Sequence, residues 1–186
     1  DVEKESNQKN NSEPTTTETT TKALIKGPPS KTDGTPQKQR LEGSVCIVTG
    51  GARGLGYGIA LRLALEGATT VVLVDMKQDE LDEAAAALEK ELQQMLKEAA
   101  PSGRTFFGLA CDMTDVDKVK NAFRFVAINL STNNRIDILV QAAGVVGMTN
   151  RLTHEVDPTN FDFVMNVNVR GIFNGCHAVL PYMIEQ

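Results

Sequence analysis

The sequence lacks the features of proteins that bind nucleic acids, span membranes or enter the secretory pathway. Its formal net charge is −5 and lysine and arginine form no cluster, which argues against nucleic acid as a partner, because phosphates are bound by clustered positive charge. No apolar run approaches the roughly 20 residues of a membrane span, and no secretory signal is recognisable. We therefore expect a cytoplasmic chain without a membrane span. The sequence begins with Asp rather than Met, so loss of the original N-terminus, with a targeting signal, is the alternative.

Cysteine and histidine are too few and too scattered for a metal centre or a disulfide framework. The three cysteines lie far apart, at Cys46, Cys111 and Cys176. We predict that they are buried thiols that act as small apolar residues in a reducing compartment. Cys111, which precedes Asp112, is the one position where a redox role stays open. His154 and His177 have no companions at metal or triad spacing and are interpreted as ordinary surface or helix residues.

The first forty residues have almost no large apolar side chains except Leu24 and Ile25. Because so little apolar surface cannot offset the entropy of ordering, we interpret residues 1–40 as a disordered leader rich in Thr, Lys and Glu. A linker, a targeting remnant or a modification site is the functional alternative. The remainder, residues 41–186, is long enough to bury one substantial core.

What the chain does contain is a glycine-rich turn between an apolar strand and a helix. Residues 45–49 are mostly β-branched, and Gly50, Gly54 and Gly56 follow closely. Glycine is needed where the backbone turns sharply and where a side chain would keep a phosphate away from the N–H groups of a helix N-terminus. The turn therefore predicts a pyrophosphate site, although glycines also close ordinary strand-to-helix turns.

The segments that follow the glycines strengthen this prediction. The next helix is predicted to bury three apolar residues, Leu55, Ile59 and Leu63, and to end at Gly67. A second strand, residues 70–75, ends in Asp75, roughly 20 residues beyond the glycines. A carboxylate at that distance accepts hydrogen bonds from the ribose of a dinucleotide.

Helices and strands then alternate along the chain. Helices are predicted over residues 79–100, 115–130 and 160–186, the last interrupted near its end by Pro181, and strands over residues 104–110 and 136–140. This alternation predicts an α/β fold with a doubly wound parallel sheet in the order 3-2-1-4. A ligand then belongs at the carboxyl ends of the first and fourth strands, where Gly50 and Gly144 lie.

The spacing Thr49-Gly50-x-x-x-Gly54-x-Gly56 resembles that of the short-chain dehydrogenase/reductase family. Three further matches follow in order: Asp112 after the third strand, Gln141-Ala-Ala-Gly144 where the family usually reads Asn-Asn-Ala-Gly, and Asn168-Val-Arg-Gly171 in the next helix. The resemblance covers about residues 41–186. It implies an NAD(P)-dependent oxidoreductase of a secondary alcohol or ketone, on a Rossmann-like sheet that is incomplete at its C-terminal side.

The resemblance also implies roles for single residues. Asp75 would bind the adenosine ribose, Asp112 the adenine, and Asn168 a water that relays protons, which makes Asn168 the one catalytic residue with a match. The residues expected at the cofactor are Thr49, Gly50, Arg53, Gly54, Leu55, Gly56, Asp75, Met76, Cys111, Asp112, Met113, Ala142, Ala143 and Gly144.

Asp75 predicts NAD rather than NADP. A 2′-phosphate would place like charges about 4 Å from the carboxylate, which costs roughly 4 kcal/mol at an effective dielectric constant near 20. That cost corresponds to a preference of about a thousandfold. Arg53 acts weakly in the other direction, because a basic residue in the turn can meet a 2′-phosphate.

The family's serine and its Tyr-x-x-x-Lys pair have no match. Tyr57 is followed four residues later by Leu61, and Tyr182 by Gln186. Because the loss of a general acid/base typically costs a hundred- to ten-thousandfold in rate, we expect the chain to be inactive alone, as the cofactor half of a longer dehydrogenase truncated before its catalytic region. The alternative is a catalytically inactive module that binds nucleotide or another subunit.

The resemblance further implies a homodimer or homotetramer that assembles through the last predicted helix. Burial of the same apolar residues against the chain's own sheet is the alternative. Gln141, in place of the usual asparagine, either replaces the missing amide at longer reach or reflects structural drift.

Overall fold

The computed structural model describes residues 39–96 and 103–186, so almost all of the predicted leader and the end of the predicted helix 79–100 lie outside the described residues. The strands form one parallel sheet in the order β3-β2-β1-β4, which confirms the predicted order. They are β1 (Val45–Thr49), β2 (Thr70–Asp75), β3 (Thr105–Ala110) and β4 (Ile138–Gln141). Thr49 pairs with both Val74 and Gln141, so the carboxyl ends of the strands meet at one edge.

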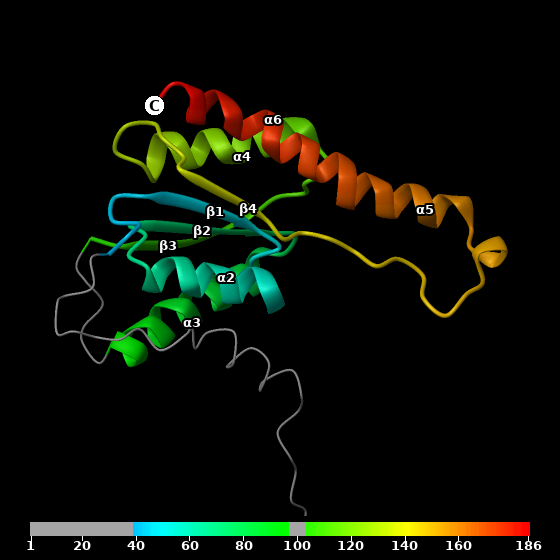
Figure 1. Ribbon diagram of the computed structural model, residues 1–186, viewed down its shortest axis with the longest axis horizontal. Coiled ribbons are helices and arrows are strands. Elements are labelled where there is room, and N and C mark those ends of the chain that lie inside the picture. The colour runs from blue at the N-terminus through cyan, green and yellow to red at the C-terminus, as the bar shows by residue number, and fades with distance from the viewer. Residues whose placement is uncertain (1–38, 97–102) are drawn as a thin grey trace, which may run out of the picture. The chain divides into compact units, whose positions relative to one another are not determined.

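Helices cover both faces of this sheet (Figure 1). Two of them, α2 (Gly54–Leu65) and α3 (Gln78–Leu96), lie on one face, and α4 (Val116–Asn129) and α6 (Gly171–Ile184) lie on the other. Between β4 and α6 come η1 (Thr153–Glu155), α5 (Pro158–Met165) and the π-helical segment η2 (Asn166–Arg170). Figure 1 shows that α5 extends beyond the carboxyl edge of the sheet.

The hydrophobic core forms because the central strands carry apolar side chains on both faces of the sheet. All five residues of β1 are buried, as expected for a central parallel strand between two helical layers. Asp115 caps the N-terminus of α4, and its carboxylate accepts the N–H groups of Asp117 and Lys118. It buries Phe123 completely against the sheet. The apolar stripes of both helices face the core: α3 buries Leu81, Leu88 and Leu92, and α4 buries Val119 and Val126 beside Phe123.

The prediction for the first helix was wrong about its buried face. Leu55 is 70% exposed and Ile59 is also exposed, whereas α2 buries Gly56, Ala60, Leu61 and Ala64. The small residues lie four apart and let the helix approach the glycine turn closely, which rotates the predicted stripe away from the sheet. Tertiary contact has overridden the apolar pattern.

Two predictions about the last helix also need correction. It is not one regular helix, because η2 widens five residues between α5 and α6 into π-helical geometry. Pro181 does not interrupt it, since α6 continues to Ile184. Proline removes only one N–H bond here and sits at an exposed position in the last turn. Asp157 caps α5 and accepts the Thr159 N–H at 2.8 Å.

The last strand begins at Ile138, two residues later than predicted. Asp137 precedes it and bonds to β1 with both its backbone and its side chain: its N–H donates to the carbonyl of Val45, and its carboxylate accepts the N–H of Val45 at 2.7 Å. A carboxylate has therefore replaced one regular ladder bond. Among the described residues, no helix is long and apolar enough to cross a bilayer, and no three metal-binding side chains gather.

The cysteines differ in exposure. Cys46 and Cys111 are buried as predicted, but Cys176 is exposed, because α6 turns Gly175 and Val179 toward the core and Cys176 away from it. Burial raises the pKa of Cys46 to about 12, and burial together with the nearby Asp112 raises the pKa of Cys111 to about 11. Both thiols are protonated at neutral pH, which argues against the redox role left open for Cys111.

We expect iodoacetamide at pH 7.5 to modify Cys176 before the other two cysteines, because alkylation requires an accessible thiolate. Mass spectrometry of peptides over a time course measures the order, and a sample in guanidinium, where all three should react, serves as the control. Rapid labelling of Cys111 in the folded protein would contradict the burial described here.

Candidate functional site

The glycine turn after β1 is built on contacts between main-chain atoms. Gly50 and Gly54 have positive φ angles of 65° and 59°, in the left-handed region that favours glycine. A Cβ on Gly56 would overlap the carbonyl oxygen of Gly50, so only glycine lets the first turn of α2 approach the end of β1 this closely. Glycine is therefore required at all three predicted positions: at Gly50 and Gly54 by the positive φ angle, and at Gly56 by the close contact.

At this turn the N-terminus of α2 presents backbone N–H groups that have no acceptor within the helix. Arg53 is the N-cap residue, its backbone is extended and its side chain makes no capping bond. The bond from the Tyr57 N–H to the Arg53 carbonyl is of the helical type, so the N–H groups of Gly54, Leu55 and Gly56 precede the helical ladder. No acidic residue lies in the first turn. Such an end attracts an anion through its N–H groups and its dipole.

The carboxyl ends of β1 and β4 are tied together beside the turn. The carbonyl of Thr49 accepts the N–H of Ala142 at 3.1 Å, and its hydroxyl accepts the N–H of Ala143 at 3.3 Å. A Cβ on Gly50 would lie 2.7 Å from the nitrogen of Ala143. The segment Ala142–Gly144 is thus placed directly against the glycine turn.

Asp75 at the end of β2 is tied to the same turn. One carboxylate oxygen accepts the N–H of Ala52 at 3.3 Å, and the other accepts the N–H of Met76 at 2.8 Å. The N–H of Gly51 donates to the carbonyl of Val74 at 3.1 Å. Each carboxylate oxygen keeps a second lone pair, so Asp75 can still accept hydrogen bonds from a ligand at the sheet edge.

The segment after β3 holds three predicted residues in different environments. Asp112 is half-buried, and one of its carboxylate oxygens accepts both the N–H and the hydroxyl of Thr114, at 2.9 and 2.7 Å. Cys111 and Met113 are buried, and Met113 packs against Gly171 of α6. Only the backbone of these two residues can therefore face a ligand at the edge.

Three other predicted residues are open to solvent around the turn. Arg53 is exposed, and Leu55 and Met76 are exposed large apolar residues, at 70% and 63%. Apolar side chains of this size gain free energy when a ligand covers them. Their exposure at the mouth of the turn is compatible with contact to a flat apolar group.

Asn168 lies in η2 and holds the segment after β4. Its side-chain oxygen accepts the N–H of Val145 at 2.8 Å, and its side-chain nitrogen donates to the carbonyl of Val145 at 2.8 Å. A Cβ on Gly144 would lie 3.3 Å from the same oxygen. Asn168 thus holds Val145, the residue that directly follows the predicted cofactor segment Ala142–Gly144. Asn168 also lies in π-helical geometry, which is typical of functional sites.

Three side-chain amides order this region, and two of them, Asn160 and Asn174, were not identified from the sequence as positioning groups. Asn160 accepts the N–H of Met148 at 2.9 Å, and the buried Asn174 donates to the carbonyls of Met113 and Thr114. Gln141 donates to the carbonyl of Ile172 at 3.0 Å, so its longer side chain ties β4 to α6 rather than to a neighbouring strand. The sequence signal that could have identified Asn160 is its spacing of eight residues from Asn168 within the predicted helix 160–186.

The comparisons with known proteins agree with this geometry. A family model described as short chain dehydrogenase matches residues 44–186. The chain belongs to this family. It is 35% identical over 147 residues to the 3-oxoacyl-[acyl-carrier-protein] reductase FabG of Thermotoga maritima, covering 79% of this chain and 53% of the relative. It is 37% identical to zerumbone synthase of Zingiber zerumbet, with 79% and 49% coverage.

Solved structures of short-chain dehydrogenases share the fold. The crystal structure of an NAD⁺-bound xylitol dehydrogenase is similar with a TM-score of 0.67 and 28% identity, over 79% of this chain and 50% of that one. The chain therefore spans about half the length of the relatives it matches. The family is one of oxidoreductases of the dehydrogenase/reductase type, in which binding of NAD(P) is typical.

Gly56→Ala is expected to destabilise the protein by about 1–3 kcal/mol, because the added methyl group collides with the backbone of Gly50. Gly58→Ala on the same helix is the matched control: a Cβ there meets nothing within 4 Å, so the replacement should stabilise α2 by about 0.5–1 kcal/mol. Urea unfolding followed by circular dichroism measures both. Equal effects of the two replacements would disprove the close contact.

Proposed function

We propose that the protein is an NAD-dependent dehydrogenase/reductase that interconverts a secondary alcohol and its ketone, and that this chain supplies the cofactor-binding half. The observation that carries the proposal is the uncapped N-terminus of α2 beside the carboxylate of Asp75. A diphosphate would accept the free N–H groups of the helix, while the carboxylate would accept the ribose hydroxyls next to it.

The arrangement of the edge supports one direction for the dinucleotide. With the diphosphate at β1 and the ribose at Asp75 on β2, the adenine would lie toward β3, where Asp112 follows the strand. The other half of the dinucleotide would then pass along Ala142, Ala143 and Gly144 at the end of β4. When bound there, the cofactor supplies the chemistry of hydride transfer, and the chain's own residues hold and orient it.

The preference for NAD is proposed on the charge of Asp75. The two N–H bonds from Ala52 and Met76 hold the carboxylate in place, so it cannot easily turn away from an added phosphate. Arg53 is exposed, so solvent screens its charge and it compensates only weakly for that repulsion. A fixed like charge therefore disfavours NADP more than the exposed cation favours it.

Asn168 is proposed as the residue of this half that takes part in catalysis, by supporting a water in a proton relay. Its side chain fixes the backbone of Val145, next to the segment expected along the cofactor. The remaining catalytic groups are expected outside residues 1–186. The hydroxyl of Tyr57 donates to Glu91 between α2 and α3, and burial raises its pKa above the ordinary value, so Tyr57 is a poor candidate for the acid/base. We therefore expect no turnover by residues 1–186 alone.

Asp75→Ala should abolish most of the discrimination between cofactors. We expect the ratio of the NADPH and NADH dissociation constants to fall from about a thousandfold to below about tenfold, because the repulsion of the 2′-phosphate disappears. Calorimetric titration of both cofactors measures the ratio. Asp117→Ala on α4, which removes an exposed charge elsewhere, is the control. An unchanged ratio in Asp75→Ala would reject the proposed ribose contact.

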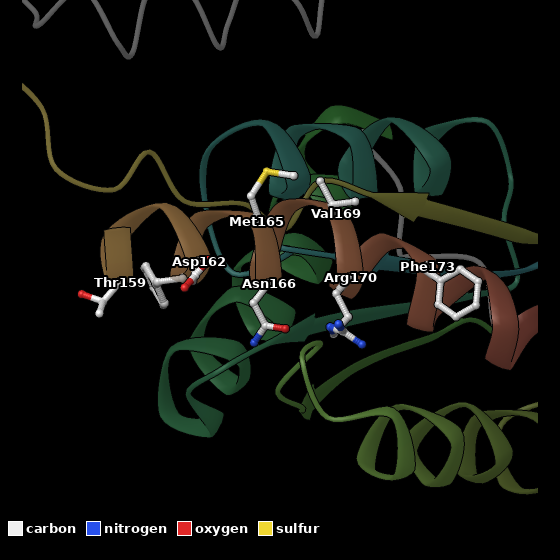
Figure 2. A pocket seen from close by; sticks show the side chains of 8 residues that line it. Thr159, Asp162, Met165, Asn166, Val169, Arg170 and Phe173 are labelled. Atoms are coloured by element: carbon white, nitrogen blue, oxygen red, sulfur yellow. The ribbon is translucent and has the colours of Figure 1, made fainter. Parts of the chain in front are cut away.

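A homodimer through the last helix is proposed on its apolar outer face. A groove of about 840 Å³ follows α5, η2 and α6, and Figure 2 shows Thr159, Asn166, Arg170 and Phe173 in succession along it. Val169 and Phe173 are exposed large apolar residues within the groove. A second copy of the same helix would cover them, and closed twofold pairing is the commonest way to do so. A small-molecule alcohol or ketone remains the other expected partner.

Phe173→Asp should convert a dimer to a monomer, because it replaces an exposed aromatic side chain of the apolar face with a charge. Sedimentation equilibrium over a range of protein concentrations measures the mass. Ile128→Asp, which changes an exposed apolar residue of α4 outside the groove, is the matched control and should not alter assembly. A monomeric wild-type protein, or a Phe173→Asp dimer of unchanged affinity, would contradict this interface.

A further inference from the structure

A second groove lies at the end of β4, on the side of the site away from Asp75. It has a volume of about 580 Å³ and is lined by residues 144–148 together with Asn160, Phe163 and Asn168. This volume lies within the range of pockets that hold small molecules. The groove begins at Gly144, which is also the last residue of the segment tied to the glycine turn.

One wall of this groove is a strap, residues 145–148, that side-chain amides fix at both ends. Asn168 bonds to both backbone groups of Val145, and Asn160 accepts the N–H of Met148 at 2.9 Å. Gly147 has a positive φ of 67°, and a Cβ there would lie 2.8 Å from the Asn160 oxygen. The strap is therefore held in one conformation although it lies outside any helix or strand.

The strap presents apolar side chains to the groove. Val146 is 84% exposed and Met148 is 56% exposed. None of the described residues that line the groove carries a charge, and the side chain of Asn168 uses both its oxygen and its nitrogen on the strap. A pocket of this kind binds an apolar group and has no cation to offset the desolvation of a carboxylate or a phosphate.

The position of the groove argues that its occupant is a substrate. The proposed diphosphate lies at β1 and the ribose at β2, so the reactive half of an extended dinucleotide lies toward β4. The groove begins at that point and continues away from the cofactor. In open α/β sheets, ligands bind in the crevice beyond the carboxyl ends of the strands, where the winding reverses.

We infer that this groove receives the apolar body of the substrate, with Val146 and Met148 as the residues that select it and Asn160 as the residue that positions Met148. The substrate class is then a secondary alcohol or ketone on a hydrocarbon skeleton rather than a sugar, a polyol or a charged acid. This inference rests on the proposed function, since it concerns the same site.

A homologous series of alcohols tests the inference in the complete natural protein. With NAD as the cofactor, kcat/KM should rise roughly two- to fourfold for each added methylene from 2-butanol to 2-octanol, and glycerol should be a poor substrate. Met148→Lys should remove most of this gain per methylene, and Val146→Lys should do the same if the first variant is poorly folded. Met95→Lys, which changes an exposed methionine of α3, should leave the gain unchanged.

The positioning role of Asn160 is tested by the same series. Asn160→Leu removes the acceptor of the Met148 N–H and should reduce the gain per methylene without changing the dissociation constant of NADH. Asn160→Asp keeps an acceptor oxygen and should restore the gain. A merely structural role would instead lower stability and NADH binding together with selectivity.

The outcomes separate this inference from the proposed function. A wild-type protein that does not bind NADH would reject the proposed function. A protein that binds NADH and oxidises glycerol as well as 2-octanol would reject only the apolar groove, as would an unchanged gain in Met148→Lys. Unfolding of both lysine variants would show that the protein's own residues cover the strap, which also overturns the inference.

Discussion

The site depends on the close packing of backbone atoms around Gly50. This residue lies against the first turn of α2 at Gly56 and against the segment after β4 at Ala143. Its neighbour Gly51 donates its N–H to Val74 at the end of β2. No side chain fits between these segments. The same absence of side chains leaves the N–H groups of α2 open at the sheet edge, so the packing constraint and the affinity for an anion have one origin.

Side-chain amides provide the second level of order. Gln141 ties β4 to α6, Asn174 ties α6 to the segment after β3, and Asn160 and Asn168 hold the strap after β4. The three asparagines bond to backbone groups outside regular helices and strands, which allows these irregular segments to keep one conformation. The long helix that carries three of these amides thereby fixes the groove as well as the sheet edge.

The sheet order, the glycine turn and most helices could be predicted because apolar periodicity and glycine spacing are local signals. The buried face of α2 could not, because it is determined by the contact of Gly56 with Gly50, two residues whose approach no periodicity reports. The bonds of Asn168 to Val145 join residues 23 apart in the sequence, so no local pattern reports them. The exposure of Cys176 depends on which face α6 turns to the core, and the amide contacts of Asn160 and Gln141 depend on tertiary distances.

The measurement that tests the central claim most directly is a titration of ¹⁵N-labelled protein with NADH, followed by amide resonances. We predict saturable shifts that are largest for Gly54, Leu55 and Gly56, whose N–H groups would bond to the diphosphate. The amides of α4 should stay unchanged. Absence of saturable binding, or shifts confined to the outer face of α5 and α6, would contradict the account.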